Sequence, residues 1–191
     1  MLSAEALLTA YASGIFPMAM EDGEIGWFAP NPRALIPLDE RFHVSRTLRK
    51  TIASGQFETT VDTCFERVIA ACGDRRDGTW ISEEIAVSYV NLHRLGHAHS
   101  LEVWVGERLA GGLYGVHLGA AFFGESMFHT VTDASKVALV ALVERLRARG
   151  FQLLDTQWKT AHLERFGAYE IPRSEYLRRL RKAITVRCRF A

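Results

Sequence analysis

Apolar and polar residues follow one another along the chain with the periods of helices and strands. The first predicted helix covers residues 2–13, where the apolar side chains fall on one face. Residues 14–33 are rich in proline and glycine, which predicts a loop. A short strand over residues 34–36 is expected next. The N-terminal part is thus predicted to be a helix, a long loop and one strand.

The remaining pattern predicts a mixed order of helices and strands. Ser45 is a suitable N-cap for a basic helix that ends near residue 54. Three strands follow closely at 99–105, 109–117 and 120–127, and their short turns indicate an antiparallel meander. The other predicted elements are a strand at 57–61, helices at 63–72, 82–95 and 134–149, a strand at 152–157, a short helix, a basic helix at 174–183 and a final strand.

This order predicts an α+β fold. The strand–helix–strand unit at 120–157 should be a right-handed crossover that joins parallel strands. The order matches GNAT acyltransferases, in which a ligand lies where adjacent strands splay after the meander. We therefore predict a small N-terminal domain with an aromatic, proline-containing loop at 1–41 and a GNAT-like acyltransferase domain at 42–191, with a mixed sheet flanked by helices. A fold alone does not give a function.

The distribution of charge matters more than its sum. The 191 residues carry 23 Lys and Arg against 22 Asp and Glu, and this net charge of +1 argues at first against a nucleic-acid partner. However, segments 41–50 and 173–189 together hold eleven basic residues and one acid, and the rest of the chain is acidic. Such an uneven distribution is compatible with a basic surface beside an acidic one.

Several sequence features indicate a cytoplasmic protein without a membrane partner. The N-terminal segment has no basic region and no long apolar run, so no signal peptide is expected. No apolar stretch is long enough to cross a membrane. Three scattered cysteines are too few for a disulfide framework, and His93, His97 and His99 lack the spacing of a metal site. We therefore expect no metal and no cofactor.

Two aromatic segments have features of a nucleic-acid site. Trp27 and Phe28 lie in a proline-fixed loop, and a rigid loop that exposes a ring can stack a nucleobase. Trp80 follows Arg75 and Arg76, which combines a ring for a base with charges for phosphates. Each segment is also compatible with a structural role, in which the rings pack on the core and the arginines are solvated.

Two strand segments place polar groups among apolar residues. Strand alternation predicts that Phe123, Glu125 and Met127 share one face, where a partly desolvated Glu125 needs a cationic or hydrogen-bonding partner. Asp155 and Gln157 are two apart and are expected on the same face of their strand. An Asp here is suited to accept a proton, and a Gln can hold a carbonyl or an amine. For Glu125 a structural ion pair is the alternative, and for Asp155 the alternative is a purely structural role.

These segments occur together, and in this order, in one family. The chain closely resembles the leucyl/phenylalanyl-tRNA–protein transferases, bacterial enzymes of the N-end rule pathway. GESMF at 124–128 and LDTQ at 154–157 are specific in this order and spacing. The resemblance covers nearly the whole chain, and its other segments are YASGIFP (11–17), WFAPNPRAL (27–35), FHVSR (42–46), GTWI (78–81), AHSLEVW (98–104), LAGGLYG (109–115), ASK (134–136) and FGAYEIP (166–172).

The resemblance implies a particular reaction and particular partners. It implies an aminoacyltransferase that moves Leu or Phe, and Met less well, from its tRNA to the α-amine of a protein beginning with Arg or Lys. The product then carries a destabilising N-terminal residue for degradation. The expected partners are aminoacyl-tRNA and these acceptor proteins, and the enzyme is expected to be a monomer.

The family's site residues are carried over to matching positions. Glu125, Asp155 and Gln157 match its active-site Glu, Asp and Gln. Relatives usually read Trp-Trp-Ser-Pro where this chain has a Trp, a Phe, an Ala and a Pro at 27–30. The resemblance assigns the binding of aminoacyl-adenosine to Trp80, Phe28 and Trp27. The pocket for the amino-acid side chain is assigned to Leu113, Leu139, Leu142 and Met127, and the tRNA backbone to Arg46, Arg49, Lys50, Arg75 and Arg76.

The chemistry of this transfer is undemanding. The donor is an activated ester, so positioning can supply much of the acceleration. An N-terminal amine has a reference pKa of about 7.7–8.0, so a usable fraction is neutral near pH 7. We expect Asp155 to accept or orient the amine proton and Gln157 to hold the amine or the ester carbonyl. The proton route, directly to Asp155, through Gln157 or through a hydroxyl of the tRNA, is left open by the sequence.

Two other functions are compatible with the predicted fold. An acyl-CoA N-acetyltransferase would cradle the pyrophosphate with a glycine-rich loop at the start of the helix after the meander. The chain has no glycine at 129–136, and Asp133 would repel phosphate. A non-enzymatic RNA-binding module is the other alternative, and it would bind tRNA without modifying a peptide.

Overall fold

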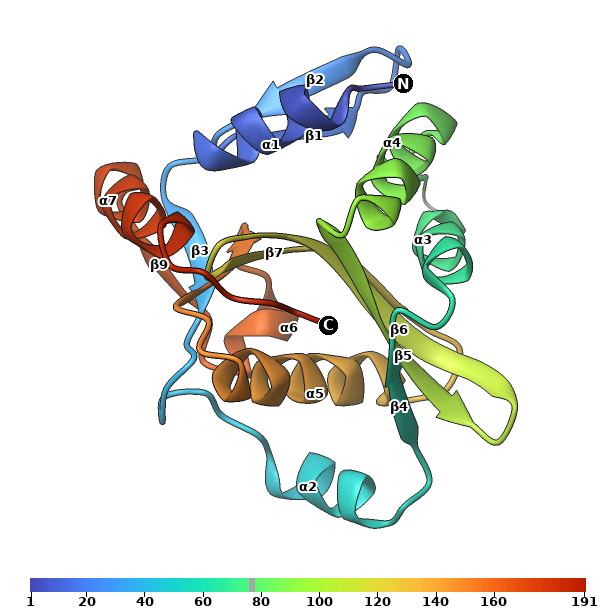
Figure 1. The fold of residues 1–191 in the computed structure, drawn as a ribbon. Helices are drawn as coiled ribbons and strands as arrows, with labels where there is room; N and C mark the ends of the chain where they lie inside the picture. The colour runs from blue at the N-terminus through green and yellow to red at the C-terminus, as the bar shows by residue number, and fades with distance from the viewer. Residues whose placement is uncertain (76–77) are drawn as a thin grey trace.

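A seven-stranded mixed sheet forms the centre of the molecule (Figure 1), and the computed structural model describes residues 1–75 and 78–191 around it. The strand order is β4-β5-β6-β7-β8-β3-β9. Their bounds are β4 (Glu58–Val61), β5 (Ala98–Val105), β6 (Arg108–Leu118), β7 (Ala121–His129), β8 (Leu153–Gln157), β3 (Arg33–Ile36) and β9 (Tyr169–Ile171). The predicted mixed sheet is confirmed.

The meander and the crossover are also confirmed. Strands β5, β6 and β7 pair antiparallel in sequence order, and β7 pairs parallel with β8. Helix α5 (Ala134–Ala148) connects β7 to β8 and is apolar over most of its surface because it packs on β5, β6 and β7. Parallel strands require such a crossover, since a tight turn can join only antiparallel neighbours.

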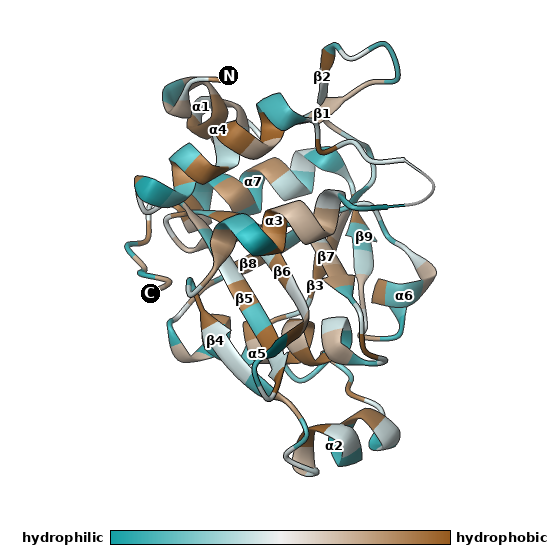
Figure 2. Ribbon diagram, turned by 90° about the vertical axis from the view of Figure 1, so that its right-hand side faces the viewer, coloured by the Kyte–Doolittle hydropathy of each residue, from teal (hydrophilic) through white to brown (hydrophobic). Residues whose placement is uncertain are grey.

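Helices cover both faces of the sheet and define two apolar cores. On one face lie α1 (Ala4–Ala12), α3 (Phe65–Gly73), α4 (Glu83–Arg94) and α7 (Arg173–Ile184). On the other face lie α5, the short helix α6 (Ala161–Glu164) and the basic helix α2 (Arg46–Ala53). Ser45 caps α2 as predicted, with its side chain accepting from the Leu48 amide. Helix α2 stands at the lower edge of the molecule, and hydrophilic and hydrophobic residues are interspersed along its ribbon (Figure 2).

The loop predicted at 14–33 is in fact a hairpin of β1 (Phe16–Ala19) and β2 (Ile25–Phe28). Pro17 lies within β1 opposite Trp27. A proline is tolerated there because the hairpin is a separate two-stranded sheet, so each strand has an edge that needs no amide donor. The prediction was wrong because it treated proline and glycine as loop signals without considering an edge strand.

Two further differences concern the C-terminal part of the chain. Residues 169–171 form β9, which was not predicted, and the final strand predicted after α7 does not form. Instead, Phe190 is buried and packs against Phe122 and His99.

Strand β3 precedes the domain boundary predicted near residue 41, yet it lies inside the large sheet between β8 and β9. The boundary itself stays a prediction, as does the GNAT-like character of the second domain.

Candidate active site

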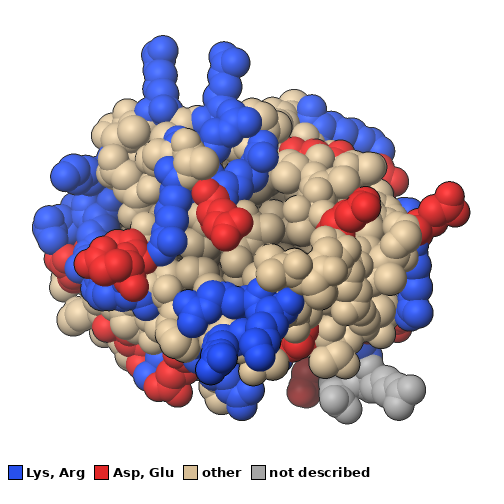
Figure 3. Space-filling view, turned by 90° about the horizontal axis from the view of Figure 1, so that it is seen from below, with Lys and Arg blue, Asp and Glu red and all other residues tan. Residues whose placement is uncertain are grey.

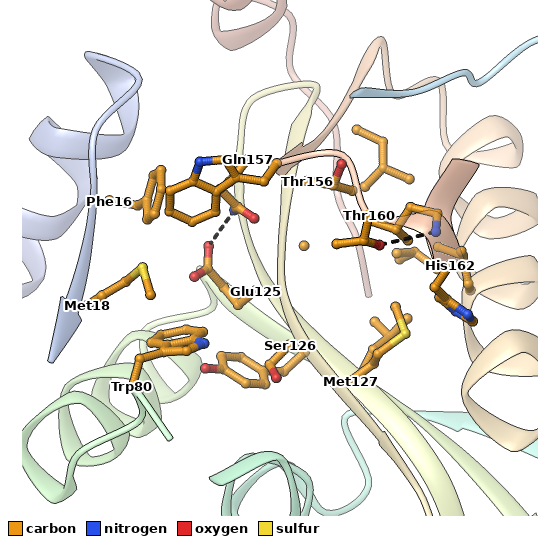
Figure 4. A pocket seen from close by; sticks show the side chains of 18 of the residues that line it. Phe16, Met18, Trp80, Glu125, Ser126, Met127, Thr156, Gln157, Thr160 and His162 are labelled. Atoms are coloured by element: carbon orange, nitrogen blue, oxygen red, sulfur yellow. Dashed lines mark hydrogen bonds between the residues drawn. The ribbon is translucent and has the colours of Figure 1, made fainter. Parts of the chain in front are cut away.

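A cavity of about 330 Å³ lies beside the ends of the parallel strands β7 and β8. Its walls also come from β1, from the segment around Trp80 and from helices α5 and α6. Figure 4 shows Phe16, Met18 and Trp80 on one side and Thr160, His162 and Met127 on the other, with Glu125 and Gln157 between them. The N-terminal hairpin thus contributes directly to a cavity whose floor belongs to the large sheet.

One end of the cavity is an apolar slot. The structure brings together all four residues that the sequence assigned to the side-chain pocket, Leu113, Leu139, Leu142 and Met127. Leu154 and Leu163 join them, and neither was identified from the sequence. His162 also lines the slot, and burial, together with the charges of Lys136 and Arg165, lowers the pKa of its imidazole, which favours the neutral ring. An apolar slot of this kind accepts a hydrocarbon side chain.

The predicted alternation along β7 is wrong because Glu125 is a β-bulge. Tyr114 pairs with Ser126 and Gly115 with Gly124, so Glu125 has no partner across the ladder. As a result, Phe123 packs in the core on the α1 side and Met127 packs in the core on the α5 side. Bulges redirect side chains, and this one turns Glu125 toward the cavity and Met127 into the slot.

Glu125 is mostly buried and is surrounded by tyrosines. The Tyr11 hydroxyl donates to its Oε1 at 2.7 Å, and the Tyr89 hydroxyl donates to its Oε2 at 3.4 Å. Burial raises the Glu125 pKa to about 8, with the nearby Asp155 charge acting in the same direction and Tyr11 and Arg33 opposing it. Burial therefore favours the neutral form of this carboxyl.

Asp155 is fully buried and does not line the cavity. Its Oδ1 accepts from Arg33 Nε at 2.9 Å and from the Gln157 amide at 2.9 Å. Its Oδ2 accepts from Arg33 Nη2 at 2.7 Å and from the Tyr176 hydroxyl at 2.6 Å. The same-face prediction for Asp155 and Gln157 therefore needs qualification: Gln157 lines the cavity, whereas Asp155 lies behind it.

Gln157 connects Asp155 to the cavity. Its φ of +58° is unusual for a residue other than glycine, and its amide is held by Asp155. Its side-chain Nε2 donates to Glu125 Oε1 at 3.4 Å, and Figure 4 marks this contact. Gln157 therefore stands between the two carboxyl groups that the sequence had identified.

Arg33 was not identified from the sequence. This arginine is 1% exposed and forms the ion pair with Asp155. A signal was present, because one Arg precedes an apolar strand at 34–36 and one Asp interrupts the apolar strand at 153–157. Two buried opposite charges are expected to pair, but nothing in the sequence shows that these two strands are neighbours.

The aromatic residues of the cavity differ from those predicted. Trp80 lines it, whereas Trp27 and Phe28 do not. Trp27 is 46% exposed, and Phe28 packs beside Phe16 at a ring distance of 6.2 Å, which is the structural role considered for it. The structure places Trp158 at the cavity, 43% exposed, with its ring edge-on to Phe16 at 5.1 Å. Trp158 directly follows the LDTQ motif and was also missed.

The predicted basic residues are divided between two places. Arg75 lines the cavity, and its Nη2 donates to Ser126 Oγ at 2.9 Å and to the Met127 carbonyl at 3.2 Å. Arg76 lies outside the described residues. Arg46, Arg49 and Lys50 are exposed on α2. Figure 3 shows groups of Lys and Arg side chains on the face of the molecule that includes α2, with Asp and Glu between them.

Two negative findings apply to residues 1–75 and 78–191. No group of three or more His, Cys, Asp or Glu side chains there is arranged to hold a metal ion. No helix in these two segments combines the length and the hydropathy needed to cross a bilayer.

Two family models match the chain. Residues 1–31 match the "Leucyl/phenylalanyl-tRNA protein transferase N-terminal domain", and residues 35–181 match "Leucyl/phenylalanyl-tRNA protein transferase". A cavity with an apolar slot and a polar end, on a chain that these models cover, defines an aminoacyltransferase. The chain belongs to the leucyl/phenylalanyl-tRNA–protein transferase family, and the resemblance found in its motifs is confirmed.

Curated relatives agree along the whole chain. The transferase of Herpetosiphon aurantiacus is 58% identical and is covered over 95% of its length by 96% of this chain. Those of Gloeobacter violaceus and Akkermansia muciniphila are 54% and 53% identical, with at least 96% of each chain covered. All three carry the name leucyl/phenylalanyl-tRNA–protein transferase.

Two solved structures show a distant similarity. The structure titled L-PGS from Bacillus licheniformis is 11% identical, with a TM-score of 0.47 over 83% of this chain and 52% of that chain. A conserved protein of unknown function from Bacteroides thetaiotaomicron is 10% identical, with a TM-score of 0.48 over 70% and 53%. Likeness at this level contributes nothing to the functional argument.

Proposed function

We propose that this protein transfers Leu or Phe, and Met less well, from aminoacyl-tRNA to the α-amine of proteins that begin with Arg or Lys. It acts as a monomer in the bacterial cytoplasm, and its products enter the N-end rule degradation pathway. The observation that carries the proposal is the cavity itself, in which an apolar slot for a donor side chain ends at Glu125 and Gln157.

The donor occupies the slot and the aromatic wall. Its Leu or Phe side chain contacts Leu113, Leu139 and Leu142, and an apolar slot distinguishes side chains by only about 1–3 kcal/mol per methylene, which explains leakage to Met. The terminal adenine stacks on Trp80, with Trp158 as the second ring at the cavity. Arg75 and helix α2 contact the phosphate backbone of the acceptor stem.

The acceptor binds at the polar end. Among the cavity-lining residues that the structure describes, Glu125 is the acidic one. A peptide that begins with Arg or Lys brings a cation to this carboxyl, and an adjacent cation favours its ionised form. Binding the basic side chain therefore moves the Glu125 proton to solvent and creates an ion pair in a poorly hydrated cavity. A peptide that begins with Asp or Ala forms no such pair.

The reaction needs positioning more than a strong base. The neutral α-amine attacks the ester carbonyl, the C–O bond to the tRNA breaks, and the amine proton moves to the departing ribose oxygen, directly or through a neighbouring hydroxyl. Gln157 holds the amine or the carbonyl during attack. Because five hydrogen bonds occupy its two oxygens, Asp155 acts through Gln157 and does not take the proton itself.

The deciding assay supplies Leu-tRNA and four peptides that begin with Arg, Lys, Asp or Ala. We expect transfer to the Arg and Lys peptides only. Gln157→Ala should lower kcat by about two orders of magnitude, the usual scale for a lost orienting group, and Asp155→Ala should do the same if it folds. Transfer to all four peptides, or normal kcat in Gln157→Ala, contradicts the proposal. Acetyl-CoA should not raise the melting temperature.

A further inference from the structure

The buried position of Asp155 does not by itself explain how this residue could affect the cavity. It has no exposed surface, yet it lies one residue from Thr156 and two from Gln157, both of which line the cavity. Every oxygen of its carboxylate is occupied, and a single neighbour, Arg33, donates to both oxygens. The orientation of Asp155 is therefore fixed by Arg33.

Arg33 is itself held from three sides. Its Nη1 donates to the Gly14 carbonyl at 3.0 Å. Its guanidinium lies 4.9 Å from the centre of the Phe16 ring and 4.6 Å from that of Tyr176, so the cation is enclosed by two aromatic rings. Phe16 is also part of the cavity wall. The arginine thus touches the wall of the cavity and the carboxylate behind it.

A path of hydrogen bonds leads from this arginine into the cavity. Arg33 donates to Asp155, and Asp155 also accepts from the backbone amide of Gln157. The side-chain amide of Gln157 in turn donates to Glu125. The middle contact supports the left-handed φ of Gln157, a conformation that a non-glycine residue keeps only when its surroundings impose it. A change in Asp155 is therefore transmitted to the side chain of Gln157.

We infer that Arg33 is a positioning residue of the transferase. It does not touch either substrate. It holds Asp155 so that the side-chain amide of Gln157 faces the reacting ester and amine. Tyr176 assists by donating to Asp155 Oδ2. A planar guanidinium suits this role because it donates in parallel to two carboxylate oxygens, which an ammonium cannot do. The inference rests on the proposed function.

The experiment measures Leu transfer to a peptide beginning with Arg, with kcat and both KM values for wild type and variants. In Arg33→Lys, which keeps the charge, we expect kcat to fall about tenfold or more, as for a misplaced catalytic group, with both KM values within about threefold. In Arg33→Ala, millimolar guanidinium should restore part of kcat, and urea at the same concentration should not.

The control is Glu102→Gln in β5. Glu102 is also fully buried and accepts from the Ser100 and Thr60 hydroxyls, but it does not line the cavity. It should lose stability and keep its kcat, without rescue by guanidinium. If Arg33→Ala does not fold, Tyr176→Phe removes a single donor to Asp155 and should lower kcat several-fold.

The outcomes separate the two proposals. Wild-type protein that fails to transfer Leu to the Arg peptide overturns the proposed function. Wild-type protein that transfers, together with folded Arg33→Lys and Tyr176→Phe variants of normal kcat, overturns the role of Arg33 alone. A loss of kcat in Glu102→Gln as large as that in Arg33→Lys also overturns it, because the effect would then be general to buried polar residues.

Discussion

At the scale of single residues, Glu125 has the most unusual chemistry. An extra residue in β7 turns its carboxyl into the cavity, and burial among tyrosines raises its pKa to about 8. In the proposed reaction this carboxyl binds the cation of the acceptor, which only its ionised form can do. The pH dependence of acceptor use therefore reports on Glu125.

We expect the rate at low acceptor concentration to rise steeply with pH. Below about pH 7 both the Glu125 carboxyl and the acceptor amine must lose a proton, so log kcat/KM for an Arg peptide should rise with a slope near two. In Glu125→Gln the value should be lower and the slope near one, because only the amine then titrates. Identical slopes in the two proteins contradict the assigned role.

Leu142 tests the slot at the same scale. Leu142→Ala enlarges the slot, so the ratio of kcat/KM for Phe-tRNA to that for Leu-tRNA should rise about tenfold, the scale expected for one or two methylenes. The variant should also lose about 2–5 kcal/mol of stability because Leu142 is buried in the core. Measurement with both donors at a temperature where the variant is folded checks this, and an unchanged ratio argues against the slot.

At the scale of elements, most helices and strands were predictable because each has a periodic apolar face of its own. The meander, α5 and α2 were correct to within two residues. The hairpin of β1 and β2 and strand β9 were missed because short edge strands carry little periodic signal. The bulge at Glu125 was missed because it depends on a register shift against β6, which no pattern within β7 reveals.

Helix α2 supports a prediction about the donor. It is basic and exposed and lies outside the cavity, so the contact with tRNA that we propose for it is independent of the ester. Changing Arg46, Arg49 and Lys50 to Glu should raise KM for Leu-tRNA by more than tenfold and flatten its salt dependence. A minimal aminoacyl-adenosine donor should be used as well as before.

A matched control for α2 is available at the C-terminal end of α7 and in the segment that follows it. Arg181, Lys182 and Arg187 are likewise exposed and basic, but they were not assigned to the donor. The same triple change to Glu there should leave KM for Leu-tRNA within about twofold. Equal losses from both triple variants would show that overall charge, and not α2, attracts the tRNA.

At the scale of the whole molecule, the candidate site is assembled from segments far apart in the chain. The four residues that the resemblance assigned to the side-chain pocket line the cavity together, and their role stays a prediction. Glu125 and Gln157 were identified from their own motifs. Arg33, Phe16 and Trp158 were not, because their roles depend on packing between the N-terminal hairpin, β3 and β8. Sequence motifs indicated which residues have unusual chemistry, and only the fold indicated which of them touch.

A second polar network lies on the face of the sheet opposite the hairpin of β1 and β2. It links β5, β6 and the C-terminal segment. His99 contacts Asp62 at 2.7 Å and His117 at 2.9 Å, and Phe190 packs on the His99 ring. Burial, and the adjacent His99 and His97, lower the His117 pKa to about 4. This network should make the stability of the molecule sensitive to acid.

The direction in which acid changes the stability follows from proton binding by His117. Between about pH 6.5 and pH 4 the unfolded chain carries a proton on His117 that the folded protein excludes, so acidification favours unfolding. We expect His117 to lower the free energy of unfolding by up to about 1.4 kcal/mol per pH unit of acidification in this range, while Glu125, whose pKa is raised, acts in the opposite direction. Denaturant titrations at several pH values measure the slope, which His117→Gln should reduce. An unchanged slope contradicts the assignment.

The position of β3 has a consequence for how the protein is made. Both neighbours of this strand, β8 and β9, are encoded about 120 or more residues after it, and Asp155 and Tyr176 emerge from the ribosome long after Arg33. The nascent chain therefore cannot complete the site until nearly all of it has been synthesised, and early segments must wait with their apolar faces uncovered. Transfer activity is thus expected to begin only after β8, β9 and Tyr176 have emerged from the ribosome, so translation products that lack these segments should not modify other proteins.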